Sequence, residues 1–277
     1  MNVMSGSISA GLGADLPIFD ERRPKMRMRP LKAWHHFRLL LKDKENTEEV
    51  FNIFEALPGR DLRERAERFL RTERGQALRR KEPWLPGILD DHATLRRTPK
   101  GSLAHAYCDF MESEGLSAQG LVDEFERFAS KRERFDDQFN WYLNRMRDVH
   151  DMLHVLTGYG RDALGEACVL AFTYSQQPAP AHLFIGYLAG MNINRNTRRS
   201  APVLRAVREG QKLGKACPRL CEQSISELLP LPIEDVRQRL NITPAVYYQQ
   251  CHAIWRSMGI DPYDLLGKNA QAKNAAA

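Results

Sequence analysis

Apolar side chains recur at helical spacing over most of this chain. Between residues 133 and 157 they fall at steps of three and four, which predicts one continuous helix with a single apolar face. The members of that face are Phe135, Phe139, Tyr142, Leu143, Met146, Val149, Leu153 and Leu156. Runs that alternate with a period of two, as strands do, are scarce. We therefore predict an all-α fold.

Start and stop signals divide the pattern into further helices. Thr47, followed by two acidic residues, starts a helix that a Pro-Gly pair ends at 58–59. Gly158 and Gly160 end the long helix and turn the chain, and Asp162 is a candidate N-cap for the next one. The remaining predicted helices cover 61–80, 102–111, 117–129, 163–176, 182–191, 201–215, 233–240 and 244–258.

The domain organisation follows from length and composition. With 277 residues, 43% hydrophobic and 27% charged, the chain is typical of a globular protein. We expect a flexible N-terminal segment at 1–27, a single helical domain at 28–260 and a flexible tail at 261–277, because both ends are low in complexity. A secretory signal and an 18-residue apolar stretch are both absent from the sequence, so we expect no membrane span.

The charged residues and the cysteines indicate which partners and which cellular compartment to expect. The formal charge of +6 is partly concentrated in Arg-rich runs, which mildly favours an anionic partner such as a membrane surface. The runs hold few aromatic residues and no nucleic-acid-binding signature, so no nucleic acid is expected. Five dispersed cysteines, an odd number, indicate a reducing compartment.

A candidate metal site lies around residue 150. His150 and His154 are four residues apart, hence about 40° apart around a helix axis and one turn from each other, so both imidazoles can reach one ion. Asp151 can serve as a third ligand or orient His154. Glu166 follows the glycine turn and precedes a stretch, 167–194, without any charged residue. A carboxylate in apolar surroundings is costly unless it is paired or bound to a metal.

Two other interpretations of these histidines remain open. Histidines at the edge of an apolar face are often ordinary core residues with satisfied hydrogen bonds. A His-Asp pair is also a feature of phosphohydrolases, for which His105 and Asp235 could be the further ligands.

The segment VHDMLHVLTGYGRDALGE at 149–166 resembles the signature of a known family. It is similar to the metal-binding coenzyme Q (ubiquinone) biosynthesis proteins, the fourth in the usual numbering, whose motif is His-Asp-x-x-His followed after eleven residues by Glu. Three further segments are similar to parts of that family: RPLKAW at 29–34, TPKGSLAHAYCDFM at 98–111, where Ala104 replaces the usual Gly, and LPLPIEDVRQRLNI at 229–242.

The resemblance implies a helical protein at the surface of the membrane that holds ubiquinone. The metal ligands and catalytic residues would be His150, Asp151, His154 and Glu166, and the reaction would be the oxidative decarboxylation of carbon one of a polyprenylated 4-hydroxybenzoate. The protein would therefore be a metal-dependent carboxy-lyase. Its expected partners are the polyprenylated quinone precursor, the membrane surface, other ubiquinone biosynthesis proteins and further copies of itself. The alternative implied by the same resemblance is a non-catalytic lipid-binding scaffold with a structural metal.

Metal, lipid contacts and location follow as expectations. Two imidazoles and carboxylates suit zinc first, with iron, manganese or cobalt as alternatives. An isoprenoid tail needs apolar surroundings, for which the uncharged segment 167–194 is the candidate, and basic residues after it could meet lipid phosphate. The predicted lipid-binding residues are Phe184, Tyr187, Leu188, Arg195, Arg198 and Arg199. The expected location is the cytoplasmic face of the inner membrane in a bacterium, or the matrix face in a mitochondrion.

Overall fold

The computed structural model describes residues 16–43, 46–130 and 132–265. Within these ranges every regular element is an α- or 3-10 helix, apart from one isolated bridge between Ser102 and Pro232, and the all-α prediction is confirmed. The described residues form two compact units. One contains those up to Met152 together with Arg219–Val236, and the other contains Leu153–Pro218 together with those from Arg237 onward.

The first unit consists of short helices and one returning segment of chain. Its helices are α1 (Pro30–Leu40), α2 (Thr47–Ala56), α3 (Leu62–Leu70), α4 (Glu73–Lys81), α5 (Leu85–Leu89), α6 (His92–Leu95), α7 (Leu103–Glu114), α8 (Ala118–Ala129), α9 (Gln138–Asp148), η1 (Leu220–Glu222) and α14 (Ile225–Leu228). The returning segment joins α7 through backbone bonds from Leu103 N to Leu231 O and from Ala104 N to Leu229 O, both 2.9 Å.

A buried ion pair fixes the returning segment inside the first unit. Arg145 of α9 and Glu82, just after α4, lie 2.6 Å apart with almost no exposed side-chain surface. Glu82 also accepts hydrogen bonds from the hydroxyls of Ser224 and Ser226, and Arg145 donates to the carbonyl of Cys221 at 2.7 Å. Because the two charges neutralise each other and most of their polar atoms are hydrogen-bonded, the pair is buried without an uncompensated charge; Nη1 of Arg145 alone has no hydrogen-bond partner among the described residues.

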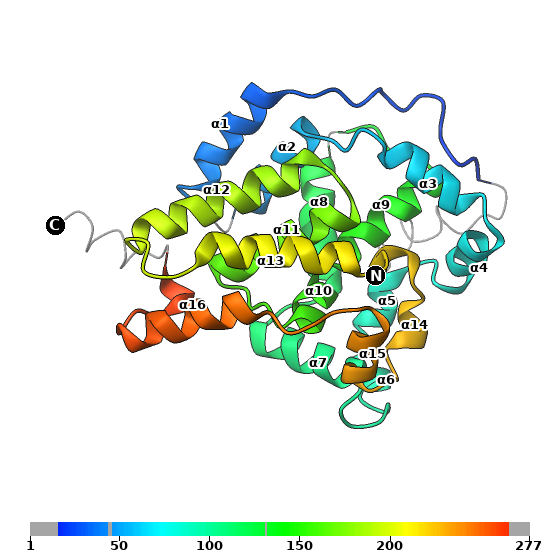
Figure 1. Cartoon of the computed structure of the whole chain (residues 1–277). Helices are drawn as coiled ribbons and strands as arrows, with labels where there is room; N and C mark the ends of the chain where they lie inside the picture. Colours follow the sequence, from blue (N-terminus) through cyan, green and yellow to red (C-terminus); the bar gives the residue numbers. More distant parts are fainter. Residues whose placement is uncertain (1–15, 44–45, 131, 266–277) are drawn as a thin grey trace, which may run out of the picture. The chain divides into compact units, whose positions relative to one another are not determined.

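The second unit is built on three long helices that pack side by side (Figure 1). Its elements are α11 (Ala163–Gln176), α12 (Pro180–Asn196), α13 (Val203–Ala216), α16 (Val246–Ser257) and η2 (Pro262–Asp264). Gly210 and Gly214 of α13 face α11 so closely that a Cβ at either position would lie 2.5 or 2.2 Å from a backbone oxygen of α11. Glycine at both positions therefore sets the short distance between these helices.

Two helices, α10 (His150–Thr157) and α15 (Ile233–Arg239), are shared by the units, because the division passes through each of them. The prediction of one helix over 133–157 is wrong at both its start and its middle. The side chain of Asp137 accepts from Asn140 N and begins α9 there, and Val149, with φ −85° and ψ 1°, separates α9 from α10. The helix predicted over 61–80 is likewise interrupted, since Thr72 caps α4 through a bond from Gly75 N.

Part of the predicted flexible N-terminal segment is packed against α9. Gln138 donates from its side chain to Leu16 O at 2.7 Å, and Arg23 pairs with the buried carboxylate of Asp137 at 2.5 Å. Phe19 contacts Phe139 edge to face. Residues 1–15 of that predicted segment, and 266–277 of the predicted tail, lie outside the described residues.

Candidate metal centre

The helix α10 presents two imidazoles on one side. The helix is continuous across the position where the two units divide, so His150 and His154 lie one turn apart, as their spacing predicts. His150 is half-buried and His154 is buried.

The ring of His154 is oriented by the turn that follows α10. Its Nδ1 lies 3.0 Å from the carbonyl oxygen of Tyr159. A carbonyl only accepts, so Nδ1 carries the proton and donates, and the lone pair of the neutral ring is on Nε2. This arrangement is typical of metal-binding histidines, whose second nitrogen is held by a hydrogen bond to an oxygen.

Glu166 meets these imidazoles from the first turn of α11. One of its carboxylate oxygens lies 3.6 Å from Nε2 of His154, and the ligand atoms of His150, His154 and Glu166 all lie within 4.8 Å of one another. Two imidazole nitrogens and one carboxylate oxygen are a donor set that binds a divalent transition metal. The described residues therefore fit the metal that the sequence predicts.

Glu166 is more exposed than the uncharged sequence that follows it indicates. Its side chain is 35% exposed, whereas that of His154 is fully covered. The guanidinium of Arg161, which is equally exposed, lies 3.9 Å from the Glu166 carboxylate. The group is consequently open on one side, and three protein ligands beside an accessible side leave room for a water or a substrate oxygen.

Asp162 fixes the start of α11 and thereby the position of Glu166. Its Oδ1 accepts from Leu164 N at 3.0 Å and from Gly165 N at 3.1 Å, which satisfies two of the free amides at the start of the helix. The predicted N-cap is confirmed.

The same carboxylate is held from the other side by α16. Tyr248 donates to Oδ2 of Asp162 at 2.5 Å, and Nε2 of His252 lies 3.3 Å from Oδ1. The Tyr248 hydroxyl in turn accepts from Gly160 N at 2.9 Å. Burial first, and then the Asp162 carboxylate, raise the pKa of Tyr248, which stays a neutral donor.

The first turn of α11 also depends on a close backbone approach. A Cβ at Gly165 would lie 1.9 Å from the carbonyl oxygen of Gly160. Any larger residue would push the helix start away from the turn. The glycines and the aspartate between the histidines and Glu166 thus place the glutamate, although none of them is a ligand.

Asp151 is not in the group that the structure brings together. It is half-buried, and its charge acts on Tyr107 of α7. The Tyr107 hydroxyl is buried without a hydrogen-bond partner among the described residues, and burial followed by the Asp151 charge raises its pKa. Asp151 as a ligand stays a prediction.

A second group with possible ligand atoms lies in the first unit. His92, Cys108 and Glu112 have their ligand atoms within 4.8 Å of one another. Glu112 is already neutralised by Arg96 at 2.8 Å and bonded to Nδ1 of His92 at 2.9 Å. This group was not predicted, and its one local signal in the sequence is the spacing of four between Cys108 and Glu112.

The other nominated residues are dispersed. His105 is bonded through Nε2 to the carbonyl oxygen of Thr98 at 3.0 Å, and Asp235 is exposed on α15, so neither belongs to the His150 group. The predicted lipid-binding residues lie on α12 and just after it. Within the helix, Phe184, Tyr187 and Leu188 are half-buried and Arg195 is exposed; Arg198 and Arg199, just after the helix, are also exposed.

Residues 39–246 match the sequence profile of the coenzyme Q (ubiquinone) biosynthesis protein Coq4. The chain belongs to the Coq4 family. A bovine relative, named as a mitochondrial ubiquinone biosynthesis protein COQ4 homolog, is 22% identical over 205 residues, which is 74% of each chain. The rat protein of the same name is 28% identical over 177 residues, and that match spans 62% of this chain and about half of the relative, 55%.

A solved structure has the same fold. A candidate ubiquinone biosynthesis protein from Nostoc punctiforme aligns with a TM-score of 0.52 at 21% identity, over 77% of this chain and 98% of that one. Among the described helices of the present chain, none is long and apolar enough to cross a membrane.

Proposed function

We propose that this chain acts in ubiquinone biosynthesis as a metal-dependent enzyme that removes the carboxyl group at carbon one of a polyprenylated 4-hydroxybenzoate intermediate. The observation that carries the proposal is the convergence of His150, His154 and Glu166, with His154 oriented by the Tyr159 carbonyl. Family membership supports the pathway, and the accessible side of the group supports a reaction rather than a purely structural ion.

In this reaction the bond between carbon one and the carboxylate breaks, carbon dioxide leaves, and the electron pair stays on carbon one. That carbon then takes up a proton. In the oxidative form one molecule of oxygen and one of water are consumed instead: carbon one gains a hydroxyl, its electron pair reduces the oxygen, and the second oxygen atom leaves in hydrogen peroxide. A divalent ion held by the three ligands would act as a Lewis acid toward the substrate oxygens.

The chain's own residues have separate tasks in this proposal. Arg161, at the exposed rim beside Glu166, supplies a positive charge that attracts the substrate carboxylate. Asp151, half-buried beside His150 in the sequence, is the group we assign to proton transfer. The half-buried apolar residues of α12, Phe184 and Leu188, are assigned to the isoprenoid tail.

The proposed setting is a membrane surface, on the matrix side in a mitochondrion or the cytoplasmic side in a bacterium. The names of the mitochondrial relatives support the first location for a eukaryotic chain. Other ubiquinone biosynthesis proteins and further copies of this chain are the proposed partners.

The test joins elemental analysis of the purified protein with carbon dioxide release from a prenylated 4-hydroxybenzoate, in the presence of oxygen. His154→Ala should lower turnover on the order of 100-fold or more, because the Lewis-acid contribution is lost. His35→Ala, which removes an exposed imidazole on α1, is the matched control and should leave turnover unchanged. A metal-loaded wild-type protein that releases no carbon dioxide would contradict the enzyme and favour a scaffold with a structural ion.

A further inference from the structure

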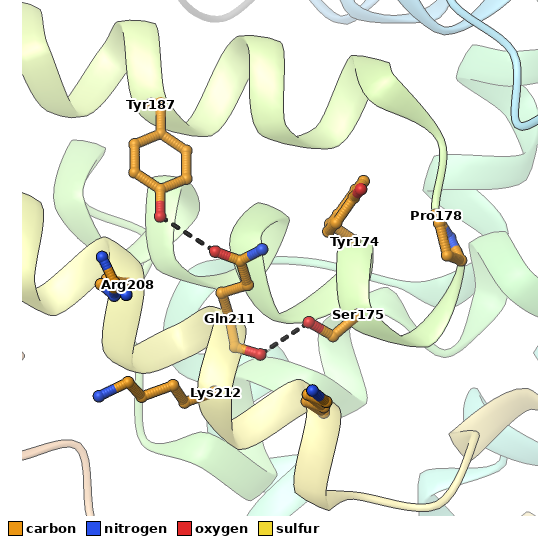
Figure 2. A pocket seen from close by; sticks show the side chains of 8 residues that line it. Tyr174, Ser175, Pro178, Tyr187, Arg208, Gln211 and Lys212 are labelled. Atoms are coloured by element: carbon orange, nitrogen blue, oxygen red, sulfur yellow. Dashed lines mark hydrogen bonds between the residues drawn. The ribbon is translucent and has the colours of Figure 1, made fainter.

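A concave site that includes none of the metal-centre residues lies in the unit that contains α11, α12 and α13. It is a cavity of about 620 Å³ whose lining comes from those three helices and from the turn after α11. The lining residues are Tyr174, Ser175, Pro178, Tyr187, Arg208, Gln211, Lys212 and Lys215. Figure 2 shows the cationic side chains of α13 on one side of the cavity and the tyrosines of α11 and α12 on the others.

One wall of this cavity carries positive side chains, and these are not paired with acidic side chains of the described residues. Arg208, Lys212 and Lys215 follow one another at steps of four and three, so they share one face of α13. None of them forms an ion pair with an acidic group of the described residues. The other walls come from the sequence 167–194, which has no charged residue at all.

The acidic residue of α13, Glu209, does not pair with these cations. Glu209 accepts from the backbone amide of Tyr247, at the start of α16, at 2.9 Å. Arg205, one turn before Arg208, lies over the ring of Tyr247 rather than in the cavity. The three cations of the cavity therefore repel one another without a local counter-charge, and a multiply charged anion would relieve that repulsion.

Polar groups at the centre of the cavity are held in place. Gln211 of α13 accepts from the Tyr187 hydroxyl at 3.0 Å through its side-chain oxygen. Its backbone carbonyl accepts from the Ser175 hydroxyl at 2.7 Å. The bond from Tyr187 orients the side-chain amide of Gln211, whose nitrogen is on the side away from Tyr187 and toward Tyr174 (Figure 2). The fixed amide adds a neutral donor to three cationic ones.

We propose that this cavity binds a phosphate anion with at least two negative charges, either a soluble phosphate compound or the headgroup of an anionic lipid. Cationic side chains combined with an amide donor are the groups that recognise phosphate oxygens. The proposal does not rest on the function proposed for the metal centre, which belongs to other residues.

The experiment uses two probes on the full chain at low ionic strength, after removal of metal by a chelator. Inorganic pyrophosphate is titrated by calorimetry, and phosphatidylcholine vesicles with and without phosphatidic acid are tested by flotation. The key variant is Arg208→Gln/Lys212→Gln/Lys215→Gln. The matched control, Arg205→Gln/Arg239→Gln/Arg256→Gln, removes the same charge from exposed positions of the same unit that do not line the cavity.

The affinity for the probe that binds should fall about tenfold in the cavity variant. In the control variant it should fall about threefold at most. Binding of pyrophosphate identifies a soluble phosphate, and binding only of phosphatidic acid vesicles identifies a lipid headgroup. His154→Ala should bind the same probe as the wild type, which separates this cavity from the metal centre. The proposal is overturned if neither probe binds, or if the two triple variants lose equal affinity.

Discussion

The Asp162 carboxylate joins the start of α11 to α16, and its removal tests how Glu166 is positioned. In Asp162→Ala the N-cap bonds to Leu164 N and Gly165 N disappear, which costs about 1 kcal/mol. The Tyr248 hydroxyl loses the acceptor that lies at 2.5 Å, and a buried donor without a partner costs about 1–3 kcal/mol. The free energy of unfolding should therefore fall by about 2–4 kcal/mol.

The effect on the metal centre is the more specific part of this prediction. Glu166 lies in the helical turn that Asp162 caps, so Asp162 orients a metal ligand. Replacing a residue that orients a ligand typically weakens metal binding, and we expect the metal affinity to fall roughly tenfold. Urea denaturation gives the stability, and a competitive titration with a coloured chelator gives the affinity. Asp162→Asn should lose less of both, because the amide oxygen can still cap the helix.

The control for this variant is another helix cap. Ser117 caps α8 by accepting from Gly120 N at 3.0 Å, so Ser117→Ala should cost about 1 kcal/mol without changing metal affinity. If Asp162→Ala stays folded and binds metal as tightly as the wild type, the carboxylate does not position Glu166 and the reasoning is refuted.

Further predictions concern two buried contacts. Glu82→Gln should lower the free energy of unfolding by about 3 kcal/mol at pH 7, because Arg145 loses its buried partner; a loss well below 1 kcal/mol would contradict this. Burial acts to raise the pKa of Glu82, but Arg145 and two serine hydroxyls outweigh it, and the net pKa is lowered. The stability from this ionisation is therefore complete above the unfolded value near 4.5 and is lost as the pH falls below it, so the wild type and Glu82→Gln should converge in acid denaturation curves. Gly165→Ala should lower metal affinity on the order of tenfold, because the new Cβ would meet Gly160 O; unchanged affinity would show that the turn yields without moving Glu166.

The features of this structure that could be predicted from the sequence are the local ones. The spacing of His150 and His154, the glycine turn and the Asp162 cap are features of consecutive residues, and helical geometry is sufficient to predict them. The break at Val149 was missed because the apolar pattern runs through it unchanged, although the backbone leaves helical geometry there.

The pattern of apolar and polar residues does not predict contacts between segments that are far apart in the sequence. The hydrogen bond from Tyr248 to Asp162 and the close approach of His252 to the same carboxylate join residues 86 and 90 positions apart, and nothing in the periodicity of α16 indicates them. The cavity was not predicted either, because its walls combine an uncharged stretch with cations that belong to another helix. The partial exposure of Glu166 is not evident from the sequence, since an apolar sequence neighbourhood does not determine which side of a helix faces water.

The most direct test of the metal centre is the metal content per chain of the wild type and of His154→Ala, purified in parallel and measured by elemental analysis. We predict one divalent transition metal ion per wild-type chain, and a loss of that ion in the variant without loss of helical content by circular dichroism. A wild-type protein that stays free of such metals after incubation with zinc, iron, manganese or cobalt, or a His154→Ala protein that retains a full equivalent, would contradict the assignment of His150, His154 and Glu166 as a metal centre.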